Sequence, residues 1–302
     1  MPPTKADVTR AATNASSPAE ISRHGWRDVL RNSYRAMAEQ NVSLAAAGIA
    51  FFIVWAIFPA LATLVVFGVL IAGKMQVVAW LSLVRVDLPD EFNRIVVAQL
   101  DSIAQRSTGL SLVAVLSAFA FSLWSGMRGA RALIAALNLV YGEHERRTFW
   151  HRQTLALALC VLGGAFLVSA LAVIVGLAGR SVLSPSTAAA QLLAPSRWPI
   201  LIAAMMLLLS FAYRYGPCRR AAQWRWVTWG ATASATIWVA GSWLLSYYAA
   251  HVPQLNPLLG SLGSVMLFLF WSYVTVLAIL LGAQINAELE RHTTHDTSAH
   301  RT

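Results

Sequence analysis

The sequence predicts an all-α, polytopic membrane protein with six transmembrane helices, and two observations support this prediction. Charged residues make up only 12% of the 302 residues and hydrophobic residues 57%, whereas a typical soluble domain carries about 25% charged residues. The apolar residues are also grouped in six blocks of a length suited to crossing about 30 Å of hydrocarbon, which takes roughly 20 residues. These blocks are residues 43–72, 109–138, 154–179, 198–215, 227–249 and 260–287.

The first forty residues precede the apolar blocks. Residues 1–20 are rich in Ser, Thr, Ala and Pro, a composition that predicts a disordered tail. Residues 21–40 contain an arginine at every fourth position, on a helical face other than that of Trp26 and Leu30; the four are Arg23, Arg27, Arg31 and Arg35. This spacing predicts an amphipathic interfacial helix with its cationic face toward the headgroups of the inner leaflet. The alternative is a short cytoplasmic helix that packs on the protein.

Residues 41–290 form the predicted six-helix membrane domain. Between its first and second spans, the stretch 90–103 is amphipathic, because one helical face holds only apolar residues: Phe92, Val96, Leu100 and Ile103. This pattern predicts a further amphipathic helix on the outer side of the membrane. Residues 291–302 predict a second disordered tail, on the cytoplasmic side.

Both termini are predicted to be cytoplasmic, because Lys and Arg accumulate in the cytoplasmic loops of membrane proteins. Of the 23 Lys and Arg residues, 17 fall on the side of the two termini and 6 on the opposite side. The formal net charge of +10 therefore indicates contact with the anionic cytoplasmic leaflet, where each Lys or Arg contributes about 1 kcal/mol, rather than with nucleic acid.

Two arginines interrupt the second apolar block, in the stretch SGMRGAR. Arg128 and Arg131 lie with Asn138 on one helical face. One interpretation is that residues 109–127 already cross the membrane, so that Arg128 marks the cytoplasmic boundary. The other is that the helix stays inside the bundle and the arginines face a polar cavity, since guanidinium groups bind phosphate and carboxylate through two parallel hydrogen bonds. All three residues are therefore candidate ligand-binding residues, and a boundary position would itself place the arginines near lipid phosphates.

The sixth block ends in the polar stretch GAQINAELE. Gln284 and Asn286 are further candidate ligand-binding residues, with capping and helix contacts as the alternative role near the interface. After the second block, the stretch YGEHERRTFWHRQ mixes acidic residues and histidines with basic ones. That mixture is typical of a solvated cytoplasmic loop, with a binding site as the alternative.

No pattern of residues predicts catalysis. The sequence has no nucleotide-binding loop, no G-x-S-x-G motif and no HExxH motif. Its two cysteines, Cys160 and Cys218, show neither a disulfide framework nor a metal-ligand spacing. We therefore expect no enzyme, no catalytic residue, no metal and no cofactor.

Three segments match the pattern of a known family when they are taken together. They are LAAAGIAFFIVWAIFPAL at 44–61, YRYGPCRRAAQWRWVTWGA at 213–231 and LLGAQINAELE at 280–290. In this order they resemble the first span, the basic turn and the terminal segment of the YihY/virulence factor BrkB family, over roughly residues 25–290. The resemblance implies six spans in the bacterial inner membrane. The family was once labelled ribonuclease BN, but phosphodiester hydrolysis would need a cluster of carboxylates or histidines that this sequence lacks.

The resulting hypothesis is an inner-membrane protein that binds or translocates an anionic or amphipathic solute, such as a lipid or an envelope precursor, without chemistry of its own. The alternative is a non-transporting membrane scaffold that binds protein partners, and a nuclease is disfavoured. The expected partners are the anionic lipids of the inner leaflet, with a second copy of the chain as a further possibility and no nucleic acid.

The distribution of Lys and Arg leads to a prediction about topology. Reporter fusions after Arg180 and after Val252 should report a periplasmic position, and fusions after Arg147, Arg220 and Thr294 a cytoplasmic one, because the positive loops stay inside. The measurement is paired alkaline phosphatase and fluorescent-protein activity. A periplasmic C-terminus would mean that one predicted span, most simply the short block 198–215, does not cross.

Overall fold

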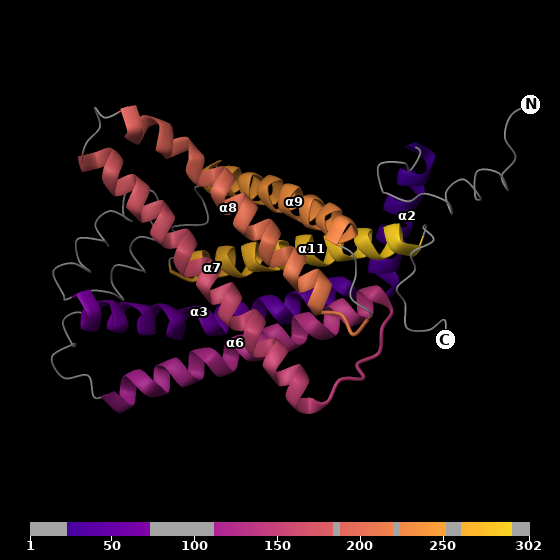
Figure 1. Cartoon of the computed structure of the whole chain (residues 1–302), viewed down its shortest axis with the longest axis horizontal. Coiled ribbons are helices and arrows are strands. Elements are labelled where there is room, and N and C mark those ends of the chain that lie inside the picture. Colours follow the sequence, from indigo (N-terminus) through magenta and orange to yellow (C-terminus); the bar gives the residue numbers. More distant parts are fainter. Residues whose placement is uncertain (1–22, 73–111, 184–187, 220–223, 252–260, 292–302) are drawn as a thin grey trace, which may run out of the picture.

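The computed structural model describes residues 23–72, 112–183, 188–219, 224–251 and 261–291, and these residues form seven α-helices and no strand (Figure 1). The all-α prediction is confirmed for this part of the chain. The helices are α2 (Arg23–Glu39), α3 (Val42–Ala72), α6 (Leu112–Tyr141), α7 (Phe149–Leu183), α8 (Ala188–Tyr215), α9 (Trp224–His251) and α11 (Ser261–Arg291).

Each predicted apolar block lies within or almost within one long helix, but only some helices meet a strict criterion for a membrane span. Among the described residues, three contain a stretch long and apolar enough to cross a bilayer: Val42–Leu61, Phe149–Ala170 and Val265–Glu290. A shorter apolar stretch, Pro199–Tyr215, lies in α8. The count of six spans therefore stays a prediction. The expected outer helix at 90–103 and the tails at 1–20 and 292–302 lie outside the described residues, and Arg291 is the last residue of α11.

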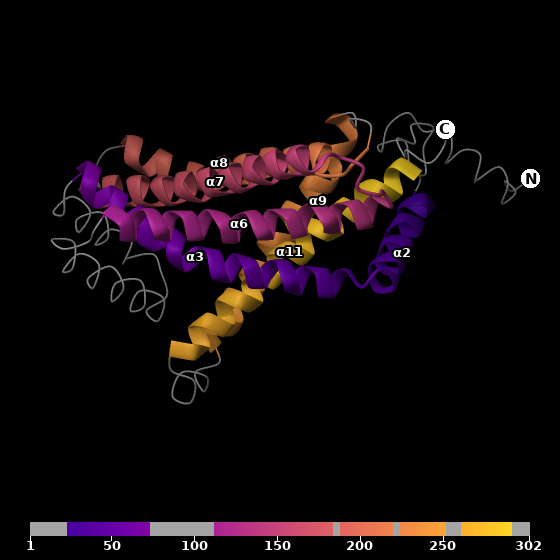
Figure 2. The same ribbon diagram turned by 90° about the horizontal axis from the view of Figure 1, so that it is seen from below.

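The six long helices form a ring in the order of the sequence. Each of α3, α6, α7, α8 and α9 packs against the next long helix along the chain, and α11 packs against both α9 and α3, which closes the ring. Helix α11 also contacts α6 and α2 (Figure 2). Helix α11 therefore packs against most of the other described helices.

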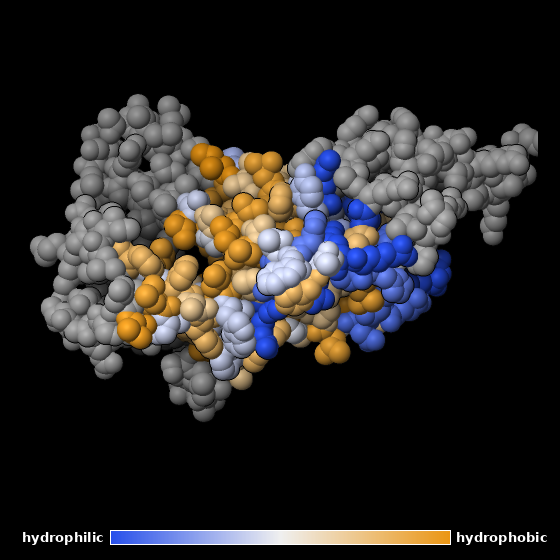
Figure 3. Space-filling model, turned by 60° about the horizontal axis from the view of Figure 1, so that its bottom comes forward, coloured by the Kyte–Doolittle hydropathy of each residue, from blue (hydrophilic) through white to orange (hydrophobic). Residues whose placement is uncertain are grey.

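Among the residues whose side chains the structure describes, most of the buried ones lie toward the end of the bundle where α2 lies, which we call the α2 end. The main buried cluster draws residues from α3, α6, α8, α9 and α11, all toward this end: among them are Val42, Leu137, Tyr213, Ala231 and Ala283. Farther from it, described side chains such as Val113 and Leu167 are exposed. Figure 3 shows hydrophilic residues gathered toward the α2 end and apolar ones over the middle of the bundle.

Helix α2 packs its apolar side on the protein. Val29 is fully buried against Ile285 and Leu289 of α11, and the rings of Trp26 and Trp229 lie 5.9 Å apart. Three of the four predicted arginines have described side chains, and all three are exposed: Arg27, Arg31 and Arg35. Packing on the protein, which was the alternative for this helix, is therefore present, and contact of the arginines with lipid stays a prediction.

Two glycines bring the backbones of α9 and α11 into contact. A Cβ atom on Gly282 would overlap the Ser234 hydroxyl and the Gly230 carbonyl, and one on Gly230 would overlap the Gly282 carbonyl and the Asn286 side chain. Small residues at helix crossings permit this close approach in membrane proteins. Gly230 and Gly282 therefore set the short distance between the polar end of α11 and the start of α9.

We predict that Gly282→Ala lowers the thermal stability of the purified protein, because overpacking a close helix crossing costs typically about 1–3 kcal/mol. Gly164→Ala in α7 is the matched control, since nothing lies within 4 Å of its Cβ position. The control should leave stability unchanged or raise it, because Ala is the better helix former by about 1 kcal/mol. Equal melting temperatures for the two variants, measured by tryptophan fluorescence in one detergent, would contradict the close crossing.

Candidate functional site

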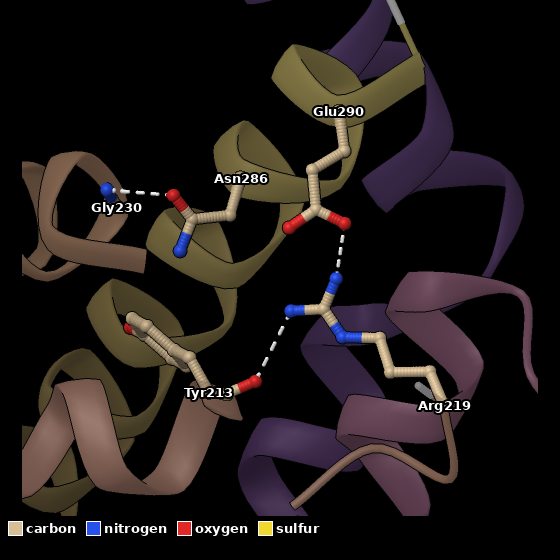
Figure 4. Close-up of polar contacts among 5 residues, drawn as sticks. All are labelled: Tyr213, Arg219, Gly230, Asn286 and Glu290. Carbon is tan, nitrogen blue, oxygen red and sulfur yellow. Dashed lines mark hydrogen bonds and ion pairs between the residues drawn. The ribbon is translucent and has the colours of Figure 1, made fainter. Parts of the chain in front are cut away.

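Polar side chains from four helices and one turn meet at the α2 end, around the guanidinium group of Arg219 (Figure 4). We call this cluster the polar hub. Its members come from α6, α8, the turn after α8, α9 and α11: they are Tyr141, Tyr213, Arg219, Ser234, Asn286 and Glu290. No two of these residues from different helices are close in the sequence, so the hub exists only in the folded bundle.

An ion pair between Arg219 and Glu290 is the central contact of the hub. The two side chains are only 1% and 8% exposed. The Arg219 guanidinium also lies 4.0 Å from the ring centroid of Tyr141 and donates a hydrogen bond of 3.2 Å to the carbonyl of Tyr213. A buried charge requires such compensation on several sides, because its desolvation costs several kcal/mol.

Hydrogen bonds join α8, α9 and α11 next to this ion pair. Asn286 accepts a hydrogen bond of 2.8 Å from the backbone N–H of Gly230 through its Oδ1 atom. The Tyr213 hydroxyl lies 2.6 Å from both the Ser234 hydroxyl and the Ile279 carbonyl. Ser234 donates in turn to the Ala278 carbonyl at 2.9 Å. Three helices are thus held in a fixed register by side chains that are buried together.

A tight turn at the end of α6 places the next loop beside the hub. Gly142 has a φ angle of 70°, and its N–H and that of Glu143 donate to the carbonyls of Leu139 and Asn138 at 3.1 and 2.8 Å. This pattern ends a helix with a left-handed residue, a conformation that glycine adopts without strain. The chain reverses there, so that Glu145 accepts a hydrogen bond of 3.0 Å from the side chain of Asn138.

Arg147 of the same loop satisfies the end of α8. Its guanidinium donates to the carbonyls of Gly216 at 2.8 Å and Tyr215 at 3.0 Å, and also to that of Pro217. The last carbonyls of a helix lack partners within the helix and attract a cation. The stretch 141–153 was expected to be a solvated loop. Through Arg147 it instead makes a tertiary contact that holds the turn at residues 216–219.

Three of the predicted ligand-binding residues lie at the α2 end. Asn286 belongs to the hub, and Asn138 accepts a hydrogen bond of 2.7 Å from the backbone N–H of Cys218. The Gln284 side chain is fully buried, and neither polar atom of its amide has a hydrogen-bond partner among the described residues. Asn286 thus makes a helix contact, which was the alternative for the polar end of α11, and Asn138 contacts the turn after α8. Ligand binding by these three residues stays a prediction.

The other two predicted residues, Arg128 and Arg131, lie farther along α6. They are 10 and 7 residues before Asn138, which places them about 10–15 Å from it along the helix axis. Arg128 is exposed, with its guanidinium 4.3 Å from the ring centroid of Trp124. Arg131 is half-buried and donates to the Met127 carbonyl at 3.3 Å and to the Gln153 side chain at 3.4 Å. The structure therefore does not bring the two arginines together with the hub.

The central pair of the hub was not predicted from the sequence. Arg219 and Glu290 are 71 residues apart, and each stands beside an apolar block where a solvated charge is also expected. One local signal was present: Asn286 and Glu290 are four residues apart and so share a helical face. Within the described ranges, no three His, Cys, Asp or Glu side chains lie close enough together to hold a metal ion.

We predict that Arg147→Lys destabilises the protein, whereas Arg146→Lys does not. A lysine keeps the charge but loses the planar fork that reaches several carbonyls of the α8 end, and each net hydrogen bond lost costs about 0.5–1.5 kcal/mol. Arg146 is the exposed neighbour and serves as the control. The comparison is of unfolding midpoints, and equal midpoints would show that Arg147 adds nothing to the end of α8.

Comparison with known proteins places the chain in a family. The family described as "Virulence factor BrkB" matches residues 33–302. The ribonuclease-like protein YfkH of Bacillus subtilis (strain 168) is 26% identical over 191 residues, which cover 62% of this chain and 68% of YfkH. A UPF0761 membrane protein of Verminephrobacter eiseniae (strain EF01-2) is 25% identical over 280 residues, 89% of this chain and 64% of that protein.

The chain thus spans about two thirds of the length of the curated relatives that it matches. No solved structure matches it. The match extends from the middle of α2 through the whole described bundle, and it includes every member of the polar hub. The protein belongs to the BrkB virulence factor family.

Proposed function

We propose that this protein crosses the bacterial inner membrane six times, with the α2 end and both termini in the cytoplasm, and that it binds and translocates an anionic, amphipathic solute such as a lipid. It does so without chemistry of its own. Membership of the family, the relative named a membrane protein and the three strongly apolar helices support the membrane part of the proposal. The 17 basic residues on the side of the termini support the orientation.

One observation favours a lipid over a soluble solute: on the surface of α6, an exposed arginine rests on an exposed tryptophan. Trp124 is 50% exposed, and the guanidinium of Arg128 lies 4.3 Å from its ring centroid. The hydrogen bond from Arg131 to Gln153 aligns this part of α6 with the first turns of α7. Tryptophan beside a cation at the edge of the hydrocarbon is typical of the headgroup region.

The start of α7 also carries exposed aromatic residues. Phe149 and Trp150 are 57% and 76% exposed, and they begin the apolar stretch Phe149–Ala170. Aromatic residues with apolar and polar edges concentrate at the headgroup level of a bilayer. Arg128 and Arg131 are therefore in a position to meet lipid phosphates, which guanidinium groups bind through two parallel hydrogen bonds. On this view the boundary and ligand-binding interpretations of the two arginines describe the same place.

Helix α2 provides the second contact that we propose with anionic lipid. Arg27, Arg31 and Arg35 are exposed, and so are Leu30 and Tyr34, at 54% and 76%. Such a mixed face suits the headgroup region of the inner leaflet, where basic residues meet phosphates and apolar ones reach the first acyl carbons.

The test is the double variant Arg128→Lys, Arg131→Lys, which keeps both charges and loses both planar forks. We expect partial loss of the phosphatidylglycerol that co-purifies with the protein, measured by mass spectrometry after the membrane level has been matched. Arg146→Lys, an exposed arginine of the adjoining loop, is the control and should retain lipid. Retention of lipid at the wild-type level by the double variant would reject recognition by Arg128 and Arg131 and would favour the non-transporting scaffold.

A further inference from the structure

We infer that the lipid bound at Arg128 lays an acyl chain along an exposed row of aromatic side chains on α3 and α6, so that it is held on the outer surface of the helix ring and not inside it. We call this row the aromatic seam; its members are Phe51, Trp55, Phe121 and Trp124. The inference rests on the proposed function and adds to the same site the part that holds the apolar portion of the lipid.

The side chains of the aromatic seam form a continuous row that ends at Arg128. The ring centroids of Phe51 and Trp55 lie 5.8 Å apart. Those of Trp55 and Phe121 lie 6.3 Å apart, and those of Phe121 and Trp124 5.7 Å. The guanidinium of Arg128 lies 4.3 Å from the Trp124 centroid, and the four aromatic residues are 40–53% exposed. The row is therefore one exposed apolar surface with a cation at its end.

The aromatic seam lies on the outside of the helix ring. Leu137 is fully buried in the main cluster and follows Arg128 by nine residues, which at 3.6 residues per turn places it on the opposite side of α6. Trp124 and Phe121 precede Arg128 by four and seven residues and so share its side of the helix. A solute inside the helix ring would not meet these side chains, whereas a lipid of the surrounding bilayer would.

The exposed surface of α7 differs from the aromatic seam. Between residues 155 and 170 of α7, the large apolar side chains that are exposed are all aliphatic: Leu157, Val161, Leu162, Leu167 and Val168. Tryptophan concentrates at membrane interfaces, yet Trp55 lies in the second half of the apolar stretch Val42–Leu61. An aromatic side chain offers a large contact area with few torsions to fix. The row on α3 and α6 thus favours one defined position for an acyl chain over general contact with the bilayer.

Charge complementarity identifies the occupant as an anionic lipid. Within the described ranges, the guanidinium of Arg128 contacts the ring of Trp124 and has neither a hydrogen bond nor an ion pair. Helices α3 and α6 contain no Asp or Glu, so they supply no counter-charge for it. A phosphate satisfies a guanidinium through two parallel hydrogen bonds. A soluble anion would leave the aromatic seam uncovered, whereas an anionic lipid covers both the cation and the row beside it.

The spacing along α6 fits the parts of such a lipid. With Arg128 at the level of the phosphates, as proposed, Trp124 lies about 6 Å and Phe121 about 10 Å farther along the helix, away from the α2 end. The indole N–H of Trp124 has no hydrogen-bond partner among the described residues, whereas that of Trp238 donates to a threonine hydroxyl at 3.1 Å. The Trp124 indole can therefore donate to a lipid ester, while Phe121 and Trp55 lie beside the acyl chain.

The experiment measures how lipid affinity depends on the length of the acyl chains. The full chain in detergent, freed of lipid, is titrated with dihexanoyl, dioctanoyl or didecanoyl phosphatidylglycerol, or with glycerol phosphate, and native mass spectrometry gives the bound fraction and the mass of the assembly. Affinity should rise with chain length. Trp55→Leu with Phe121→Leu should flatten this rise and weaken binding of the longest chains by roughly tenfold, because two aromatic contacts are lost. Trp243→Leu with Phe270→Leu, at exposed positions of α9 and α11, is the control and should keep the rise.

The parental rise in the folded Trp55→Leu, Phe121→Leu variant would overturn the inference. A dimeric parent that this variant converts to a monomer would also overturn it, because a second copy of the chain would then cover the aromatic seam, and so would glycerol phosphate that binds as tightly as the lipids. If the double variant does not fold, Trp55→Leu alone should flatten the rise in part, and failure of both to fold would assign these side chains a structural role and reject the inference.

A second variant separates this inference from the proposed function. Arg128→Lys with Arg131→Lys keeps the aromatic seam, so it should weaken binding by a similar factor at every chain length and leave the rise intact. Unchanged affinity in this variant, together with a flattened rise in Trp55→Leu, Phe121→Leu, would reject recognition of the headgroup by the arginines and support the aromatic seam. The reverse pattern would reject the seam and support the headgroup recognition.

Discussion

The structure depends on the burial of one guanidinium group. The Arg219 side chain has lost almost all contact with solvent, and a permanently charged side chain in that position has to be compensated from several directions at once. Glu290 supplies the counter-charge, Tyr141 the aromatic face and Tyr213 a carbonyl, and these three come from α11, α6 and α8. Correct placement of one side chain therefore specifies the relative position of three helices. Apolar packing alone specifies such a register less sharply, because neighbouring apolar surfaces can slide past one another with small changes in free energy.

Arginines have two different roles in this bundle, and exposure separates them. Arg219 and Arg147 act inside the protein, one on a carboxylate and the other on the carbonyls at the end of a helix. Arg128 rests on the surface of α6 against an aromatic ring, and three arginines of α2 are exposed as well. The inner set makes contacts that shape the α2 end, whereas the outer set faces the surroundings of the protein. The positive charge of the chain is thus divided between buried contacts and the exposed surface.

The sequence was a good guide to the helices and a poor guide to the hub, for physical reasons. Apolar blocks follow the length of hydrocarbon that a helix must cross, so the block at 43–72 and the helix Val42–Ala72 agree closely. Helix α8 begins ten residues before its predicted block, at Ala188, because Gln191 and Arg197 interrupt the hydropathy without interrupting the helix. Asn286 was recognised because a polar residue near an apolar span is conspicuous. The pairing of Arg219 with Glu290 was not, since hydropathy and periodicity describe neighbours along the chain and contain no information about contacts across 71 residues.

The loop after α6 has a consequence for how the protein can be altered. By composition it is a hydrophilic linker, the kind of segment into which tags and epitopes are commonly inserted. The length of this loop matters, because it is fixed at one end by the turn at Gly142 and along its course by the hydrogen bonds of Glu145 and Arg147. An inserted residue would move the Arg147 guanidinium away from the carbonyls to which it donates. Tolerance to insertion depends on the hydrogen bonds of the affected backbone and not on its polarity. In this bundle the loop acts as a spacer of fixed length between the end of α6 and the turn after α8.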